Sequence, residues 1–246
     1  MTLIRTLLAA ASLGVALTAT AQEPAAIRKT LVERIPQLEK IDEIRPTAMK
    51  GLYEVRVGTD LFYTDTKGNF LIQGELIDTQ ARRNLTEDRI KQLTAVDFNA
   101  LPLQDAFVTV RGNGKRKLVV FADPNCGYCK RFERDLLNVD NITIHTFLYP
   151  ILSPESAEKS RNIWCAKDRT TAWNDWMLRD KTPPAASCDT TALQRNLAFG
   201  KKHKITGTPT LLFANNLRIP GAVGAAEIEK RLTEIDASAN KVSVAQ

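Results

Sequence analysis

The pattern of hydrophobic and polar residues predicts a small mixed module in the first third of the chain. Apolar residues recur at helical spacing over residues 25–35, which predicts an amphipathic helix. The period changes to two over residues 53–57, and two further strand-like segments, 61–64 and 70–73, flank a turn that contains Gly68. We expect a small antiparallel sheet with one helix. This module contains no cysteine or histidine, so no chemistry is predicted for it.

A linker with one helix is predicted next. Thr86 is placed to cap a helix, and Glu87 and Asp88 lie in its first turn, where the helix dipole favours acidic side chains. The helix should end before Leu101-Pro102, because the residue before a proline disfavours helical geometry. These signals divide the chain into an N-terminal module over residues 22–80, a linker over 81–105 and a larger module over 106–246.

The larger module alternates between strand and helix patterns. Segments 107–110 and 117–122 read as strands around a tight turn, and 142–149 reads as another strand after an intervening helix, so a right-handed parallel crossover is predicted. Helical patterns then form an insertion over about residues 151–200, which begins at the strong start signal Ser153-Pro154-Glu155. The chain closes with a hairpin over 210–220 and a helix over 225–235.

The most informative motif is Cys126-Gly127-Tyr128-Cys129, which follows the apolar run 118–121 and opens a helix. Two cysteines three apart on a first helical turn face the same way. The first thiol lies where backbone N–H groups and the helix dipole stabilise negative charge, which lowers its pKa. Cys126 is therefore predicted to attack disulfides and Cys129 to resolve the mixed disulfide. Gly127 and Tyr128 between them are expected to tune the redox potential. The alternative is an inert disulfide at a helix end.

The other two cysteines, Cys165 and Cys188, are 23 positions apart and are predicted to form a structural disulfide on the helical insertion. A second redox pair is the less favoured alternative, because nothing nearby lowers either pKa. A zinc site over the four cysteines is also disfavoured, since it would need a second short cysteine or histidine pair. No metal and no cofactor are expected.

Thr208-Pro209, just before the apolar strand 210–214, is the second functional candidate. Proline donates no ladder hydrogen bond and belongs at a strand start or edge. A cis-proline that faces the cysteine pair would leave the backbone of Thr208 free to pair with an extended substrate peptide. The alternative is an ordinary trans-proline at a strand start.

The first 21 residues predict a cleaved signal peptide, with Arg5, an apolar core over 7–17 and the small residues Ala19-Thr20-Ala21. An N-terminal membrane anchor is the alternative, although the apolar run is short for a bilayer span. Cleavage removes only one charge from a net charge of +6. The basic residues are dispersed and few aromatics accompany them, so nucleic-acid binding is not expected.

Strand, CxxC helix, strand, hairpin and terminal helix is the order of the thioredoxin fold. Together with the flanking sequence, these motifs resemble the DsbC family of bacterial periplasmic disulfide isomerases. The matching segments are Phe121-Ala122-Asp123, the CxxC motif, residues 163–168, 184–189 and 207–209, and in the first module residues 51–57, 61–63 and 72–74. The chain departs from the family at Pro124-Asn125. The predicted class is thus α+β, with a small N-terminal dimerisation domain, a linker helix and a C-terminal thioredoxin-like domain.

The resemblance implies a periplasmic isomerase that rearranges incorrect disulfides in exported proteins and also holds them as a chaperone does. It implies a homodimer built through the N-terminal module, which would otherwise expose strand edges, and a membrane reductant of the DsbD type. A simple packing role for that module is the alternative. Two other functions remain open. One is a DsbG-like protein that protects single cysteines from over-oxidation, which Gly127-Tyr128 disfavours, and the other is a holdase chaperone.

Overall fold

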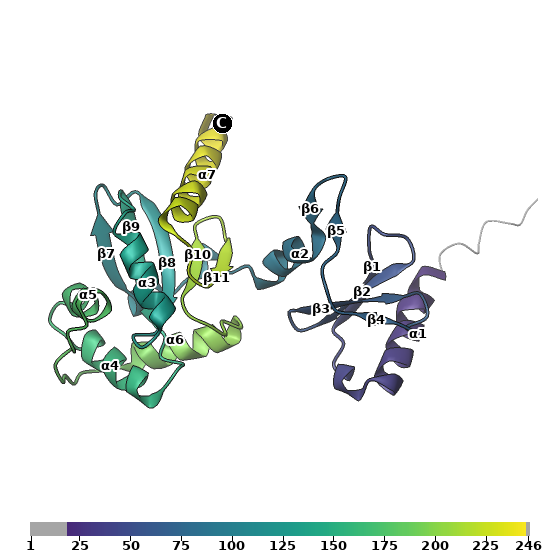
Figure 1. Ribbon diagram of the computed structural model, residues 1–246, viewed down its shortest axis with the longest axis horizontal. Helices are drawn as coiled ribbons and strands as arrows, with labels where there is room; N and C mark the ends of the chain where they lie inside the picture. The colour runs from purple at the N-terminus through teal and green to yellow at the C-terminus, as the bar shows by residue number, and fades with distance from the viewer. Residues whose placement is uncertain (1–18, 245–246) are drawn as a thin grey trace, which may run out of the picture. The chain divides into compact units, whose positions relative to one another are not determined.

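The computed structural model describes residues 19–244, and side chains from residue 23 to residue 238. Residues 1–18 of the predicted signal peptide lie outside this range. Between Leu93 and Thr94 the chain divides into two compact units, each considered by itself below (Figure 1). Over residues 19–244, no helix combines the length and the apolar character that crossing a membrane requires.

The first unit packs one helix against a four-stranded antiparallel sheet with strands in chain order. Its elements are α1 (Ala19–Arg34), a short 3-10 turn (Pro36–Leu38), β1 (Glu43–Pro46), β2 (Leu52–Val57), β3 (Asp60–Asp65), β4 (Leu71–Ile72), a two-stranded ribbon of β5 (Ile77–Asp78) and β6 (Arg83–Asn84), and α2 (Leu85–Thr94). Ile27 and Leu31 of α1 are buried against Tyr53 and Val55 of β2. The predicted amphipathic helix and sheet are confirmed.

A buried carboxylate joins α2 to this sheet. Glu54 of β2 is only 4% exposed, although its polar side chain alternates with apolar neighbours in the sequence. It accepts two hydrogen bonds from Arg45, at 2.9 and 3.0 Å, and one from Arg89 of α2 at 3.2 Å. Arg89 also donates to Glu43 at 2.7 Å. A buried charge is tolerated when it is paired in this way, and the pairing makes α2 part of the first unit.

The start of α2 differs from the prediction. The side chain of Asn84, not Thr86, accepts the backbone N–H of Glu87, at 3.0 Å. Thr86 is buried, and its hydroxyl accepts the N–H of Leu76 at 2.7 Å and also bonds the hydroxyl of Tyr63. The helix that the sequence assigns to a linker is therefore fixed to the first unit at its first turn.

The second unit is a five-stranded mixed sheet with helices around it (Figure 1). Its elements are two short 3-10 turns (Phe98–Ala100 and Leu103–Asp105), β7 (Phe107–Arg111), β8 (Arg116–Ala122), α3 (Gly127–Leu136), β9 (Ile142–Leu148), α4 (Pro154–Trp164), α5 (Arg169–Arg179), α6 (Thr191–Lys202), β10 (Thr210–Phe213), β11 (Arg218–Pro220) and α7 (Ala225–Val244). Strand order is β11-β10-β8-β9-β7. The predicted parallel crossover is present, since β8 and β9 pair in parallel through α3.

The turn at residues 112–114 does not close a paired hairpin, in contrast to the simplest interpretation of the sequence. β9 lies between β7 and β8, and Ile142 at its start is the register partner of both Arg111 and Arg116. The connection therefore passes the end of β9. Gly112 and Gly114 both have positive φ, +55° and +63°, which this tight passage requires.

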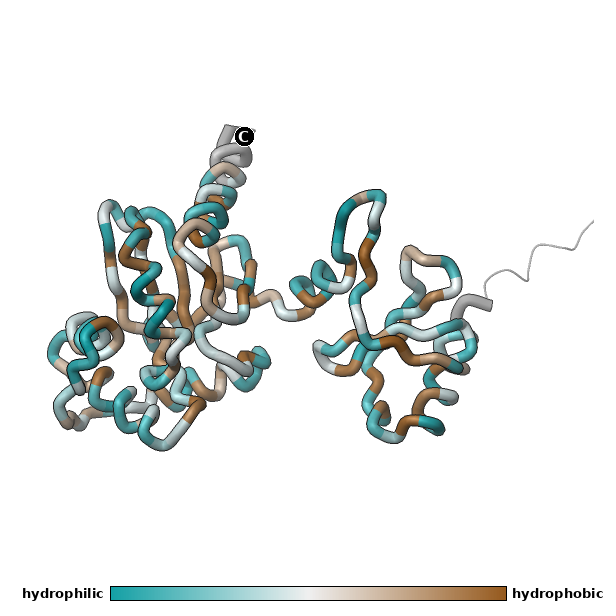
Figure 2. Tube along the Cα trace, in the orientation of Figure 1, coloured by the Kyte–Doolittle hydropathy of each residue, from teal (hydrophilic) through white to brown (hydrophobic). Residues whose placement is uncertain are grey.

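The middle of the sheet forms the core. Residues 118–122 of β8 and 211–213 of β10 are at most 1% exposed, and Figure 2 shows the central strands of this unit as predominantly hydrophobic. Strands covered on both faces read as continuous apolar runs. The core thus holds the carboxyl end of β8 rigid, and this end leads directly into Cys126.

Replacing Gly200 by alanine should destabilise the second unit. Glycine inside a helix normally costs up to about 1 kcal/mol relative to alanine. Here, however, a Cβ on α6 would overlap the ring of Tyr149, so we expect a net loss of about 1–3 kcal/mol from overpacking. Chemical unfolding followed by tryptophan fluorescence measures this, because all three tryptophans lie in the second unit. Gly224→Ala, where a Cβ meets no atom within 4 Å, is the control. Equal stability of the two variants would refute the packing argument.

Candidate active site

A buried carboxylate shapes the segment between β8 and α3. Asp123 is fully buried and accepts the backbone N–H of Asn125 at 2.8 Å, of Ile151 at 2.9 Å and of Leu152 at 3.0 Å. Its carbonyl accepts the N–H of Cys126 at 3.1 Å. Asp123 therefore ties the loop after β9 to the segment that carries Cys126, and the chain enters α3 at a fixed angle.

Cys126 caps the N-terminus of α3. Its Sγ accepts the N–H of Cys129 at 3.3 Å and, as a thiol, donates to the carbonyl of Thr208 at 3.2 Å. A hydrogen bond from the Cys129 thiol lowers the pKa of Cys126 to about 5, with further lowering by the side chain of Thr208 and the N–H groups of Cys129 and Tyr128, against burial that raises it. The thiolate, which is the nucleophilic form, predominates at neutral pH.

Cys129 lies one turn into α3 and is 1% exposed. Burial raises its pKa, and the adjacent Cys126 raises it further. Cys129 therefore stays a thiol, and it can supply a proton to hold the thiolate of Cys126. The two free cysteines thus differ strongly in acidity, which suits one for attack and the other for resolution.

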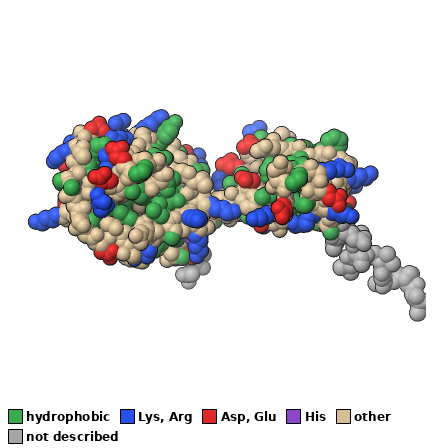
Figure 3. Space-filling model, turned by 90° about the horizontal axis from the view of Figure 1, so that it is seen from below, with side chains coloured by type: hydrophobic (Ala, Val, Ile, Leu, Met, Phe, Trp, Pro, Cys, Tyr) green, Lys and Arg blue, Asp and Glu red, His purple; other side chains and the backbone are tan. Residues whose placement is uncertain are grey.

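The surface beside Cys126 is open and apolar. Tyr128 is 68% exposed, and a Cβ at Gly127 would meet no atom within 4 Å, so packing does not require a glycine there. Leu152 and Ile151, in the loop bound by Asp123, are also exposed. Figure 3 shows hydrophobic side chains gathered on one face of this unit.

The Thr208-Pro209 segment faces the cysteine pair. Its peptide bond is cis, and the Thr208 carbonyl contacts Cys126. The Thr208 hydroxyl is buried and not engaged by another group among the described residues, and as a donor it lowers the pKa of Cys126. Tyr149 supports this loop, since its hydroxyl donates to the carbonyl of Ile205 at 2.9 Å. The structure thus brings together the two segments that the sequence singled out.

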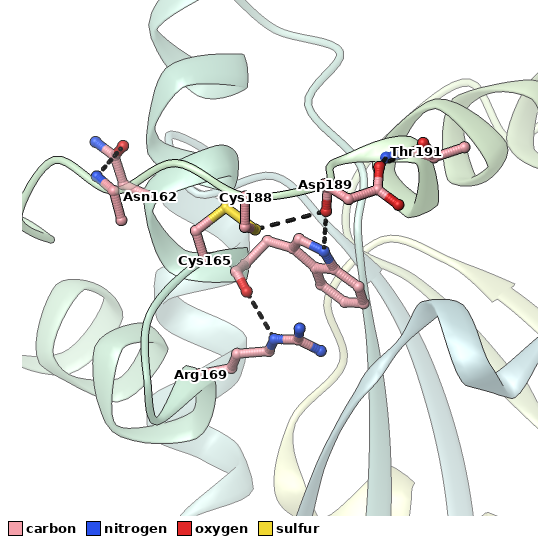
Figure 4. Close-up of a disulfide and its surroundings, with 8 residues drawn as sticks. Asn162, Cys165, Arg169, Cys188, Asp189 and Thr191 are labelled. Atoms are coloured by element: carbon pink, nitrogen blue, oxygen red, sulfur yellow. Dashed lines mark hydrogen bonds between the residues drawn. A yellow bond between two sulfur atoms is a disulfide. The ribbon is translucent and has the colours of Figure 1, made fainter.

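Cys165 and Cys188 form a disulfide with a Cα–Cα distance of 5.5 Å (Figure 4). Cys165 ends α4, and Cys188 lies in the loop before α6. The indole of Trp164 donates to the carbonyl of Asp189 at 3.2 Å, and Arg169 donates to the carbonyl of Trp164 at 2.7 Å. The disulfide links the end of α4 to the loop before α6, inside the helical insertion, and occupies both sulfurs.

Sequence reasoning did not identify three residues that contact the segment before Cys126. Asp123 appears above only within a segment that matches the family, and Lys159 is not singled out. The sequence predicts Trp176 as part of the core of the insertion, where it does pack. Trp176 also donates to the carbonyl of Pro124, and Lys159 donates to the side chain of Asn125. Lys159 and Trp176 lie far from Cys126 in sequence and give no local signal, because only the tertiary fold brings α4 and α5 to this segment.

Comparisons with known proteins match both units. Residues 18–87 match the family described as "Disulfide bond isomerase protein N-terminal domain", and residues 103–236 match "Thioredoxin-like domain". The crystal structure of a disulfide interchange protein from Neisseria gonorrhoeae superposes with a TM-score of 0.52 at 36% identity, covering 55% of this chain and 97% of that one. These matches confirm the predicted fold class.

The chain is also similar to relatives described as thiol:disulfide interchange proteins. The thiol:disulfide interchange protein DsbC of Salmonella typhimurium is 30% identical over 235 residues, or 93% of each chain. The probable thiol:disulfide interchange protein DsbC of Bordetella parapertussis is 48% identical over 182 residues, which is 74% of this chain. The chain spans 65% of the length of that Bordetella relative.

Proposed function

Because the chain belongs to the DsbC family of thiol:disulfide interchange proteins, we propose that it is a disulfide isomerase that acts on exported proteins with incorrect disulfides. The observation that carries the proposal is Cys126, an N-terminal helix cysteine whose pKa is lowered to about 5, placed against the Thr208 backbone. A reactive thiolate beside a peptide-binding backbone is what attack on a substrate disulfide requires.

Thiol–disulfide exchange at Cys126 conserves atoms and electrons without a cofactor. The Cys126 thiolate attacks one sulfur of a substrate disulfide, a new Cys126–substrate disulfide forms, and the other substrate sulfur leaves as a thiolate. A different substrate thiolate can then attack the mixed disulfide, which releases Cys126 and leaves a rearranged disulfide with no net oxidation. Alternatively, Cys129 loses its proton and attacks Cys126, which releases reduced substrate and leaves the Cys126–Cys129 disulfide.

Two electrons must then return Cys126 and Cys129 to the reduced form. We assign this step to a membrane reductant of the DsbD type in the periplasm, with residues 1–21 as the signal peptide that directs export. The reductant rests on the family resemblance, and the signal peptide on Arg5, the apolar core over 7–17 and the small residues Ala19-Thr20-Ala21. Gly127 and Tyr128 would tune the potential, and Thr208 and Pro209 would hold the substrate backbone.

The first unit is proposed to form the homodimer. Strand β4 lies at the edge of its sheet, and two apolar side chains at this edge, Phe70 and Ile72, are 70% and 50% exposed. An uncovered apolar strand edge is a template for pairing with a second copy. Dimerisation would place two reactive cysteines around one bound substrate, which would keep that substrate captured between exchange steps.

Recovery of activity from a scrambled-disulfide substrate tests the function. We expect the chain from residue 22 to restore activity in glutathione buffer, and the second unit alone, residues 94–246, to be much less effective. Sedimentation at micromolar concentration should give a dimer for the longer protein. If both proteins isomerise equally, the dimer is unnecessary. If neither isomerises but the protein oxidises reduced thiols, the isomerase proposal fails.

A further inference from the structure

The two residues before Cys126 are held by side chains of the helical insertion. The indole Nε1 of Trp176, on α5, donates to the carbonyl of Pro124 at 2.5 Å. The ammonium of Lys159, on α4, donates to Oδ1 of Asn125 at 2.9 Å. Both contacts fall on Pro124-Asn125, the two residues that lead from Asp123 into Cys126.

Trp176 is itself fixed by two cations. The ammonium of Lys130, the residue after Cys129, lies 3.9 Å from the centre of its ring, and that of Lys159 lies 4.3 Å away. Both lysines are largely shielded, with side chains 18% and 12% exposed, which strengthens a cation–π contact relative to one in water. The indole thus connects α3, α4 and α5 at the point where α3 begins.

The geometry at Cys126 depends on this segment. Its Sγ lies 3.2 and 3.3 Å from the Thr208 carbonyl and the Cys129 N–H. Both contacts rest on the backbone torsions of residues 124–126, and hydrogen bonds weaken steeply when their geometry changes. Asp123 fixes the inner side of the segment through backbone N–H groups. From the insertion, Trp176 and Lys159 donate to this segment, and Ser153 accepts from the side-chain amide of Asn125 at 3.4 Å.

We propose that Trp176 and Lys159 are positioning residues that hold the Pro124-Asn125 segment so that Sγ of Cys126 faces the donors which stabilise its thiolate. The inference rests on the proposed function only in taking Cys126 as the reacting thiol. It gives the helical insertion a part in the reactivity of the site, in addition to its packing.

Trp176→Phe in the full chain tests the proposal, since it keeps an aromatic ring for the lysines and removes the N–H donor together with part of the indole. The readout is the pH at which alkylation of Cys126 by iodoacetamide is half-maximal. We expect the acid dissociation constant of Cys126 to fall about fivefold, the effect of one lost hydrogen bond. The matched control is Trp164→Phe, which loses an indole donor to Asp189 in the same insertion. This control should leave the acid dissociation constant of Cys126 unchanged.

Lys159→Met is a second variant, which removes the donor to Asn125 and the cation over Trp176, and it should also raise the half-maximal pH of Cys126 alkylation. Lys159→Arg should return that pH part of the way, because it restores a cationic donor. An intact Cys165–Cys188 disulfide and an unchanged thermal midpoint show that each variant is folded. Alkylation uses no protein substrate, so failure of the isomerase proposal would not alter this result. Half-maximal pH values equal to that of Trp164→Phe in both Trp176→Phe and Lys159→Met would overturn the positioning role.

Discussion

Iodoacetamide should alkylate Cys126 of the reduced protein at a rate that is nearly constant from about pH 6.5 to about pH 8, because the thiolate is already fully formed. The half-maximal rate should fall near the pKa of Cys126, which its contacts with Cys129 and Thr208 lower to about 5. An ordinary cysteine, with a pKa of about 8.5, would instead react about tenfold faster for each pH unit over this range.

Mass spectrometry after timed quenching assigns the modified residue. Cys129 should remain unmodified throughout this range, because burial raises its pKa. Cys129→Ala is the informative control, since it removes the thiol donor that contributes most to the lowered pKa and should move the half-maximal pH of Cys126 upward. A rate that climbs steadily to pH 8 in the unaltered protein would contradict the assignment of Cys126 as an activated thiolate.

The stability of the reduced protein should depend on pH through the same group. Because the pKa of Cys126 is lower in the folded protein than in the unfolded chain, its thiolate stabilises the folded state fully above the unfolded value of about 8.5. This stabilisation is lost as the pH falls toward 5. Between about pH 6 and about pH 8, unfolding should therefore take up close to one proton from this residue.

Urea unfolding of reduced protein at several pH values measures this dependence. The difference between the unaltered protein and Cys126→Ser isolates the contribution of Cys126, since serine does not ionise there. The oxidised protein has no thiolate at Cys126, so its stability should also lack this part of the pH dependence. If the unaltered protein and Cys126→Ser lose stability equally as the pH falls from about 8 to about 6, the thiolate does not stabilise the fold.

Local sequence signals predicted the elements that position the reactive cysteine. The apolar run of β8 predicted a buried strand, and Ser153-Pro154-Glu155 predicted the start of α4, where Ser153 caps the helix. These features depend on residues within a few positions of one another. The order in which strands pair depends instead on contacts between distant segments. The turn at residues 112–114 therefore did not reveal that β9 lies between β7 and β8.

Side-chain contacts across the fold were the other part that sequence could not supply. Glu54 reads as a solvent-facing residue of an alternating strand, yet Arg45 and Arg89 make its burial possible. Trp176 reads as a core residue of an amphipathic helix, yet its N–H reaches Pro124. In both cases the partner lies far away in sequence, and only packing of complete elements determines which side chains meet.

Capture of the mixed disulfide is the most direct test of whether Cys126 attacks the substrate. Cys129→Ser, mixed with a scrambled-disulfide substrate and quenched with acid, should accumulate a covalent complex, because the thiol that would resolve it is absent. Peptide mapping should place the substrate on Cys126 and leave the Cys165–Cys188 disulfide intact. A complex linked through Cys165 or Cys188, or no complex although the unaltered protein isomerises the substrate, would contradict the mechanism.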